Sequence, residues 1–274
     1  ESARARLGLD KPLPVQYGIF IRDVLHGNFG KSYIYGKPAM DLIFERMPAT
    51  LELVAVAACL VLCIAIPLGV YAGAYPKRAS SKLIMSGSIL GISLPSFWVG
   101  MMMIYIFAVV LRLLPASGRG NTVMVGNVAL SIFAPGGIRY VILPAITLAL
   151  TNVATMLRLT RSGILENMRQ DYIKFARAKG VPAKSILFGH ALKNALIPVV
   201  TIFGMDLGNM IAFTTITETI FAWPGMGKLL IDAINKSDRP IIVAYLMAAA
   251  CMFVVLNFIV DILYTLIDPR IELR

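Results

Sequence analysis

The sequence is poor in charged residues, which make up 15% of its 274 residues. Soluble domains carry about 25%, whereas hydrophobic residues here reach 58%. This composition excludes an ordinary soluble domain and indicates a protein embedded in a lipid bilayer. The formal net charge of +11 is spread over separate loops rather than gathered in one patch. We therefore expect contact with anionic lipid head groups, and no nucleic-acid partner.

Cysteine and histidine are equally scarce. The three cysteines, Cys59, Cys63 and Cys251, all lie in apolar runs, so they predict neither a disulfide framework nor a zinc site, and we expect them to face lipid or to fill packing space. The two histidines, His26 and His190, lie in segments that the topology below puts on opposite sides of the membrane. They cannot share a catalytic triad, and we expect His190 to pack within its loop. The sequence thus predicts no catalytic and no metal site.

A phosphate-binding loop is also missing. Such a loop needs the pattern GxxxxGK[ST], whose backbone amides surround the phosphates. The nearest run, LHGNFGKS at residues 25–32, has leucine in place of the first glycine, and GMGK at 225–228 lacks the following serine or threonine. We expect no cofactor and no ATP site in this chain.

Long apolar runs predict an all-α, multi-pass transmembrane bundle. A membrane helix needs roughly 20 mainly apolar residues. Five spans satisfy this length, at residues 49–74, 83–114, 140–159, 195–217 and 241–267. The second span is interrupted at Ser93-Leu94-Pro95, where the proline removes a backbone donor, so we expect a tilt or a kink there.

Basic loops set the expected orientation. Lysine and arginine are concentrated at residues 76–82 and 158–193, and the loops at 115–139 and 221–240 hold fewer. The positive-inside rule places the first two loops and the C-terminus in the cytoplasm and the residue 1 side in the periplasm. The basic N-terminal segment conflicts in part with this rule, although longer segments translocate largely regardless of charge.

The chain divides accordingly into three parts. Residues 1–48 are expected to form a small outer cap with short helices at 15–25 and 38–47. Residues 49–267 form the membrane domain, which includes a cytoplasmic loop at 161–194 and an outer re-entrant loop at 219–240, and residues 268–274 form a cytoplasmic tail.

The cytoplasmic loop carries the signals of a short helix. Asp171 is placed to cap it, Gly180 to end it in a left-handed conformation, and Pro182 to block its continuation. Tyr172 and Phe175 share one face, and Lys174, Arg177 and Lys179 surround this face with positive charge. Such a helix suits the groove of a soluble partner. The alternative is a helix that lies on the membrane surface.

Asp206 is the clearest ionisable residue inside a predicted span. Charges in a membrane are costly, so this carboxylate predicts a translocation pathway that favours cationic or amine-bearing substrates. Asn209, three residues later, is placed to hydrogen-bond it, and Gly204 and Gly208 allow close helix approach. The alternative is a buried carboxylate with only a structural role. Met102 is a further pathway candidate, with a lipid-facing position as its alternative.

Other polar residues near the span ends predict structural contacts. Glu218 is expected to cap a helix or to pair with an arginine of an outer loop. Glu52 and Asp261 are expected to pair or to reach the interface. Trp98 and Trp223 are expected to anchor the protein at the interface or to pack within loops.

Several motifs together resemble one family. The run DYIKFARAKG at 171–180, with HALKNALIP at 190–198, resembles the cytoplasmic EAA loop of bacterial ABC importer permeases, in the dipeptide, oligopeptide and nickel branch. Lys174-Phe175-Ala176 stands where the name-giving triplet would be, so we expect Phe175 and Arg177, not a glutamate, to make the main contacts. Supporting motifs are LGLDKP at 7–12 with Gln16-Tyr17, GNFG at 27–30 with Ser32, PATL at 48–51, ILP at 142–144, Glu218 with FAWPG at 221–225, and DPR at 268–270.

The resemblance implies a type I ABC importer permease in the bacterial inner membrane, with a sixth, N-terminal span. It implies a homologous second permease as a heterodimer partner, two ABC ATPases that hold ATP and Mg, and an external binding protein that meets the cap and the tip at 235–239. The substrate would be peptides, or alternatively a nickel chelate, glutathione or an opine-like compound. From the residues alone, a self-sufficient channel or a secondary transporter stays open. The expected ATPase contacts are Asp171, Tyr172, Phe175, Ala176, Arg177, Lys179 and Gly180.

Overall fold

A computed structural model describes residues 12–267 of the chain. Residues 7–11 of the LGLDKP motif and the tail at 268–274, which begins with the DPR motif, lie outside the described residues. The side chain of Asp261 lies outside them as well. The helices are α2 (Leu13–Leu25), α3 (Ala39–Ala74), α4 (Ala79–Ser93), α5 (Ser96–Met103), α6 (Ile138–Asn167), α7 (Asp171–Ala178), α8 (Ala183–Ser185), α9 (Leu192–Ile220), α10 (Met226–Asn235) and α11 (Arg239–Ile267), with π-helical segments η1 (Ile104–Val110) and η2 (Ile186–Ala191) and strands β1 (Val123–Val125) and β2 (Val128–Leu130).

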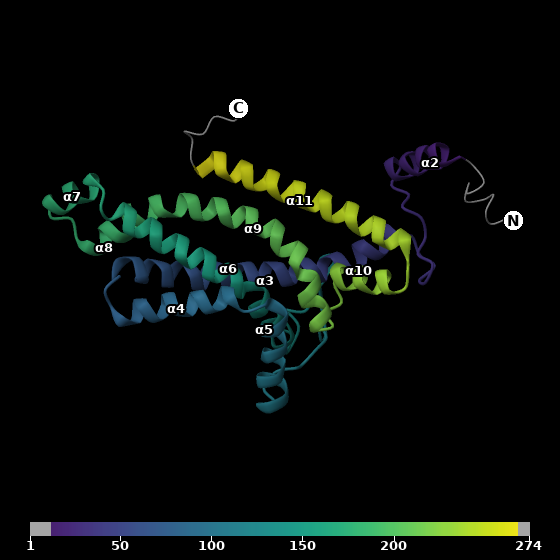
Figure 1. Cartoon of the computed structure of the whole chain (residues 1–274), viewed down its shortest axis with the longest axis horizontal. Helices are drawn as coiled ribbons and strands as arrows, with labels where there is room; N and C mark the ends of the chain where they lie inside the picture. The colour runs from purple at the N-terminus through teal and green to yellow at the C-terminus, as the bar shows by residue number, and fades with distance from the viewer. Residues whose placement is uncertain (1–11, 268–274) are drawn as a thin grey trace.

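The long helices run side by side in an elongated bundle (Figure 1). Helices α7 and α8 lie at one end, called the α7 end below, and α2 and α10 lie towards the other, called the α10 end. Within residues 12–267, four helical stretches are long and apolar enough to cross a membrane, or five if the bent pair of α4 with α5 and η1 counts as one span. The five predicted spans therefore correspond to α3, this bent pair, α6, α9 and α11.

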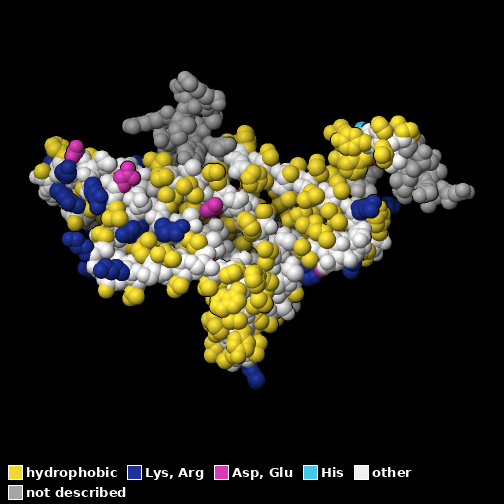
Figure 2. Space-filling model, viewed as in Figure 1, with side chains coloured by type: hydrophobic (Ala, Val, Ile, Leu, Met, Phe, Trp, Pro, Cys, Tyr) yellow, Lys and Arg dark blue, Asp and Glu magenta, His cyan; other side chains and the backbone are white. Residues whose placement is uncertain are grey.

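The predicted kink in the second span is a sharp break. The axes before and after it differ by 105°, because Leu94 and Pro95 both adopt extended backbone conformations between α4 and α5. As a result α5 projects sideways from the bundle (Figure 1), and its visible face is largely hydrophobic (Figure 2).

Helix α3 is longer than expected. The sequence predicts a separate helix at residues 38–47 and a domain boundary after residue 48, but α3 continues from Ala39 to Ala74 through Pro48 and Pro67. Proline removes one hydrogen bond from a helix, and buried side chains on both sides of Pro48, among them Ile43 and Leu53, hold the helix together across it. The short helix expected at residues 15–25 is α2, which has no buried residue.

The hairpin of β1 and β2 was not predicted. Val125 pairs with Val128 in antiparallel register, and Gly126 turns the chain with a φ of 63°. Glycine followed by asparagine between two apolar triplets is a recognised hairpin signal, and it is visible in the sequence VMVGNVAL at 123–130.

Glycines let the long helices approach closely. In the most extensive helix pair, α3 with α6, a Cβ atom at Gly69 would lie 2.6 Å from the Cβ of Thr160 and 2.8 Å from the carbonyl oxygen of Leu157. The close approach expected at Gly204 and Gly208 is confirmed, because side chains of α11 occupy the space where their Cβ atoms would be.

Three apolar clusters fill the described part of the bundle. One lies among α3, α6 and α9, and another lies at the α10 end among α3, α10 and α11. The third joins α3, α6, α7, η2 and α9 at the α7 end. The segment that follows α6, which carries α7 and η2, is therefore packed against the bundle. The three cysteines are exposed, as residues that face lipid would be.

Candidate functional site

One residue of helix α7 is buried against the bundle, and another is exposed on the opposite side of the helix. Ile173 is fully buried and packs in the cluster that contains Ile164 and Ile186. Phe175 points the other way and is 61% exposed, with the ammonium of Lys179 lying 4.4 Å from its ring centroid. The Phe175 ring thus lies on the outer surface of α7, away from the bundle.

The two ends of α7 differ in how well the sequence predicts them. Gly180 has a φ of 76°, as expected, and the following amide of Val181 donates to the carbonyl of Ala176 at 3.2 Å, which closes the helix. The expected cap at Asp171 is wrong: this residue is the first of the helix, and Gln170 precedes it without a side-chain cap. The carboxylate instead accepts from Nζ of Lys174 at 2.8 Å, which lowers the pKa of Asp171.

Tyr172 ties α7 to the bundle. Its hydroxyl donates to Oδ1 of Asn167 at 2.8 Å and accepts from Nδ2 of Asn194 at 3.0 Å. These two residues are the last of α6 and an early residue of α9, so Tyr172 links α7 to the ends of two long helices. Ala176 packs against the inner cluster and shapes the helix rather than presenting a surface.

Exposed basic side chains are concentrated at the α7 end of the bundle. Figure 2 shows lysine and arginine side chains gathered at the α7 end, in agreement with the expected distribution of basic loops. Arg177 and Lys179 are both exposed. His190 is exposed as well, contrary to the expectation that it packs, because Ile186 and Ala191 take the inward positions of η2.

A polar cavity of about 360 Å³ lies midway along the bundle, mainly between α6 and α9. It brings Asp206 and Asn209 together, and the amide of Asn209 is hydrogen-bonded to the carboxylate of Asp206. Met102 lies on α5 and is not part of the cavity wall, so the structure does not join it to the other two pathway candidates. The wall consists of Ser96, Thr147, Leu148, Thr151, Asn152, Thr155, Asp206, Asn209, Met210, Phe213 and Thr217.

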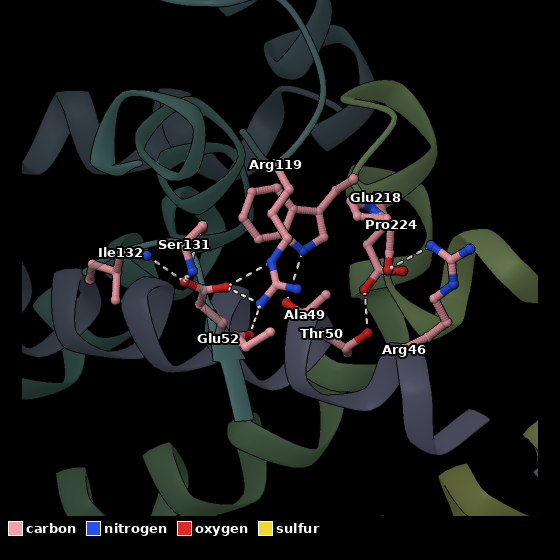
Figure 3. Close-up of polar contacts among 11 residues, drawn as sticks. Arg46, Ala49, Thr50, Glu52, Arg119, Ser131, Ile132, Glu218 and Pro224 are labelled. Atoms are coloured by element: carbon pink, nitrogen blue, oxygen red, sulfur yellow. Dashed lines mark hydrogen bonds and ion pairs between the residues drawn. The ribbon is translucent and has the colours of Figure 1, made fainter. Parts of the chain in front are cut away.

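Glu52 is paired, as expected, but it is also deeply buried. Arg119 donates to Oε2 from Nε at 2.9 Å and from Nη2 at 2.5 Å. The other oxygen accepts from the backbone and hydroxyl of Ser131 and from the amide of Ile132. Figure 3 shows these donors converging on one carboxylate, which anchors the loop that carries β1 and β2 to α3.

Glu218 caps a helix, which is one of its two expected roles. Its carboxylate accepts from the hydroxyl of Thr50 at 2.6 Å and from the amide of Lys228 at 2.9 Å, in the first turn of α10. The alternative of an arginine from an outer loop does not hold within the described residues, where Glu218 is in no ion pair and the loop residue Arg119 pairs with Glu52. Helix N-termini leave backbone amides without partners, and the carboxyl group of Glu218 accepts from one of them, so Glu218 holds α10 in place.

The two motifs PATL and FAWPG, at residues 48–51 and 221–225, lie in contact. Trp223 is fully buried and its indole Nε1 donates to the carbonyl of Ala49 at 2.8 Å. Thr50 accepts from the amide of Met226. Trp223 therefore packs from its loop against the helices of the bundle, whereas Trp98 is 42% exposed.

The tip at residues 235–239 is only partly available for contact. Asp238 is fully buried and accepts from the hydroxyl of Ser32 at 2.5 Å and from the amide of Tyr33 at 3.2 Å. The Gly-Lys-Ser run that partly resembles a phosphate-binding loop thus uses its serine to hold this tip. Asn235, Lys236 and Ser237 remain exposed.

Comparison with known proteins agrees with these features. Residues 65–273 match the family model described as "Binding-protein-dependent transport system inner membrane component". The chain is 40% identical to the oligopeptide transport system permease protein AppB of Bacillus subtilis, over 97% of this chain and 83% of that protein. It is 38% identical to the dipeptide transport system permease protein DppB of Alkalihalophilus pseudofirmus, over 97% and 84%, and 36% identical to DppB of Escherichia coli, over 98% and 84%.

Solved structures show the same fold. The inward-facing MetNI methionine ABC transporter matches with a TM-score of 0.64 at 16% identity, over 84% of this chain and 97% of that chain. An amino acid ABC transporter with histidines matches with a TM-score of 0.54 at 14% identity, over 84% and 94%.

Proposed function

Because the chain belongs to the family of binding-protein-dependent transport system inner membrane components, and is thus the permease subunit of an ABC importer, we propose that it moves di- or oligopeptides delivered by an external binding protein. Support comes from relatives that are named for dipeptides and oligopeptides and align over nearly the whole chain. Nickel chelates, glutathione and opine-like compounds are the alternative substrates. The family match bears out the resemblance of the sequence motifs.

The partners follow from this role. ATP and Mg are held by two separate ABC ATPase subunits, and a homologous permease completes the pathway beside the polar cavity. The α7 end faces the cytoplasm, which is supported by its gathered basic residues. The α10 end, with the cap at 1–48 and the exposed part of the tip at 235–239, faces the periplasm and meets the binding protein.

We propose that α7 couples transport to ATP hydrolysis by seating Phe175 in a groove of the ATPase, with Arg177 and Lys179 beside it. The observation that carries this proposal is the exposure of Phe175 on a helix that Ile173 locks in place. Asp171 and Gly180 bound the helix. Because Tyr172 is hydrogen-bonded to both α6 and α9, a push on α7 tilts these helices between inward-facing and outward-facing states. The alternative is a basic helix on the membrane surface.

Phe175→Asp is expected to weaken association with the ATPase by about thirtyfold or more, since loss of a hot-spot residue costs roughly 2 kcal/mol or more. Co-purification of the ATPases with the permease from native membrane, followed by ATP-driven peptide uptake, measures this. Phe188→Asp is the matched control, because it is another exposed aromatic of the same end outside α7. Unchanged association in Phe175→Asp, or equal loss in both variants, would contradict docking through α7.

A further inference from the structure

The polar cavity carries charge of one sign only. Asp206 is its one charged wall residue, and no lysine or arginine lines it. Within residues 12–267, no ion pair involves Asp206. A half-buried carboxylate without a counter-ion in the membrane part of a protein is costly, so a positive group that enters the cavity is favoured over a neutral or negative one.

Three other polar side chains of the wall reinforce this preference, because each already donates a hydrogen bond to a backbone carbonyl of α6. Thr147 donates its hydroxyl hydrogen to the carbonyl of Leu143 at 2.9 Å, and Thr155 donates to that of Thr151 at 3.2 Å. Asn152 donates from Nδ2 to the carbonyl of Leu148 at 3.3 Å. The two threonine hydroxyls therefore present only lone pairs to the cavity, and Asn152 presents its amide oxygen and its second N–H.

The hydrogen bond of Asn209 to Asp206 leaves further capacity on the carboxylate. A carboxylate accepts about four hydrogen bonds, and one amide uses one of them. Asp206 on α9 thus faces an acceptor-rich wall on α6 across a cavity of about 360 Å³, which suits a compact group with several donors.

We propose that this cavity is a subsite for the ammonium group of the transported peptide, with Asp206 as its counter-ion. The inference rests on the proposed function as a peptide importer and names the chemical group that the pathway recognises. A free peptide N-terminus has a pKa of about 7.7–8.0, so it is mainly charged at neutral pH, and its three N–H donors match the carboxylate and the hydroxyl lone pairs. A peptide carboxylate has only acceptors and is repelled there. Phe213 and Met210 supply apolar contact beside the charged group.

Uptake by the complete transporter tests this subsite. The permease pair, its ATPases and its binding protein are reconstituted in proteoliposomes, and ATP-driven uptake of Ala-Ala is measured with the binding protein saturated. Asp206→Asn is expected to lower the uptake rate about tenfold, the factor that roughly 1.4 kcal/mol of lost stabilisation produces. The double variant Asp206→Asn with Asn152→Asp returns a carboxylate to the opposite wall of the same cavity, and it is expected to recover most of the loss.

A second ligand separates charge recognition from packing. In lactoyl-alanine a hydroxyl replaces the ammonium group of Ala-Ala, and its uptake, scaled to the amount held by the binding protein, is expected to change less than about twofold in Asp206→Asn. Equal losses for both ligands, or no recovery in the double variant, would show that Asp206 is only structural and would overturn the subsite. Absence of ATP-driven Ala-Ala uptake by the unmodified transporter would instead count against the proposed function.

Discussion

Replacing Arg119 by methionine is expected to lower the free energy of unfolding by about 3–5 kcal/mol, because removal of one partner of a buried ion pair leaves the other charge uncompensated. The side chains of Arg119 and Glu52 are only 11% and 2% exposed. Methionine keeps much of the packing of the arginine stem but donates no hydrogen bond, so Oε2 of Glu52 loses both of its donors. The carbonyl of Ala129 loses its donor as well.

Fluorescence of Trp223 measures this loss in detergent solution. The guanidinium carbon of Arg119 lies 5.7 Å from the Trp223 ring centroid, so the indole reports on unfolding at this site. The chain has two tryptophans, and a Trp98→Phe background leaves Trp223 as the reporter. Denaturant and thermal midpoints are then compared between the variants.

Two further variants decide whether charge is the cause. Lys37→Met removes an ion pair with Glu45 whose side chains are 57% and 53% exposed, and such surface pairs contribute about 0–1 kcal/mol. Glu52→Gln combined with Arg119→Met removes both charges and is expected to be less destabilising than Arg119→Met alone. If Arg119→Met unfolds no more easily than Lys37→Met, the anchoring role of this pair is refuted.

Gly69→Val is the second change with a large expected effect. A Cβ atom at this position would lie 2.6 Å from the Cβ of Thr160 and 2.8 Å from the backbone oxygen of Leu157, and neither neighbour is the flexible end of a side chain. Valine adds two methyl groups to that overlap, so α3 and α6 must separate. Overpacking of this kind costs about 1–3 kcal/mol, and occasionally more. We expect the thermal midpoint to fall, and ATP-driven uptake to fall with it because α6 leads directly into α7.

Gly87→Val is the matched control for this change. Gly87 lies in the interior of α4, and nothing stands within 4 Å of the Cβ atom that would be added there. The same substitution should therefore leave the thermal midpoint unchanged or raise it slightly, since valine has a higher helix propensity than glycine. Equal destabilisation by both variants would attribute the effect to valine in a membrane helix rather than to the α3–α6 contact.

The sequence predicts the positions of the membrane helices well, and it predicts the breaks within them less well. Spans at residues 195–217 and 241–267 correspond to α9 and α11, because runs of this length and hydropathy have few stable alternatives in a bilayer. Pro95 marks the break before α5 as expected. Pro48 does not end α3, because buried contacts on both sides of the proline outweigh the single hydrogen bond that it removes.

The segment around α7 shows the same division between what the sequence predicts and what it does not, at the level of single residues. Gly180 ends α7 as its sequence position indicates, since the left-handed conformation favours glycine. Ile173 was not identified as the anchor, because the spacing of Tyr172 and Phe175 says which residues share a face but not which face the bundle covers. His190 is exposed for the same reason, because the sequence does not show that Ile186 and Ala191 take the buried positions of η2. The error at Asp171 is a helix boundary misplaced by one residue.

The sequence by itself determined that this chain is a multi-pass membrane protein whose motifs resemble importer permeases. It also determined where the spans lie, which loops carry positive charge, and that Asp206 lies inside a span. Apolar length, basic loops and local motifs fix these properties because each depends on residues close together along the chain. Only the tertiary structure decided which side chains contact one another. Glu52 meets Arg119 across 67 residues, and Thr50 meets Glu218 across 168. The acceptor-rich wall opposite Asp206 arises because α6 packs beside α9, and no local pattern specifies which helices become neighbours.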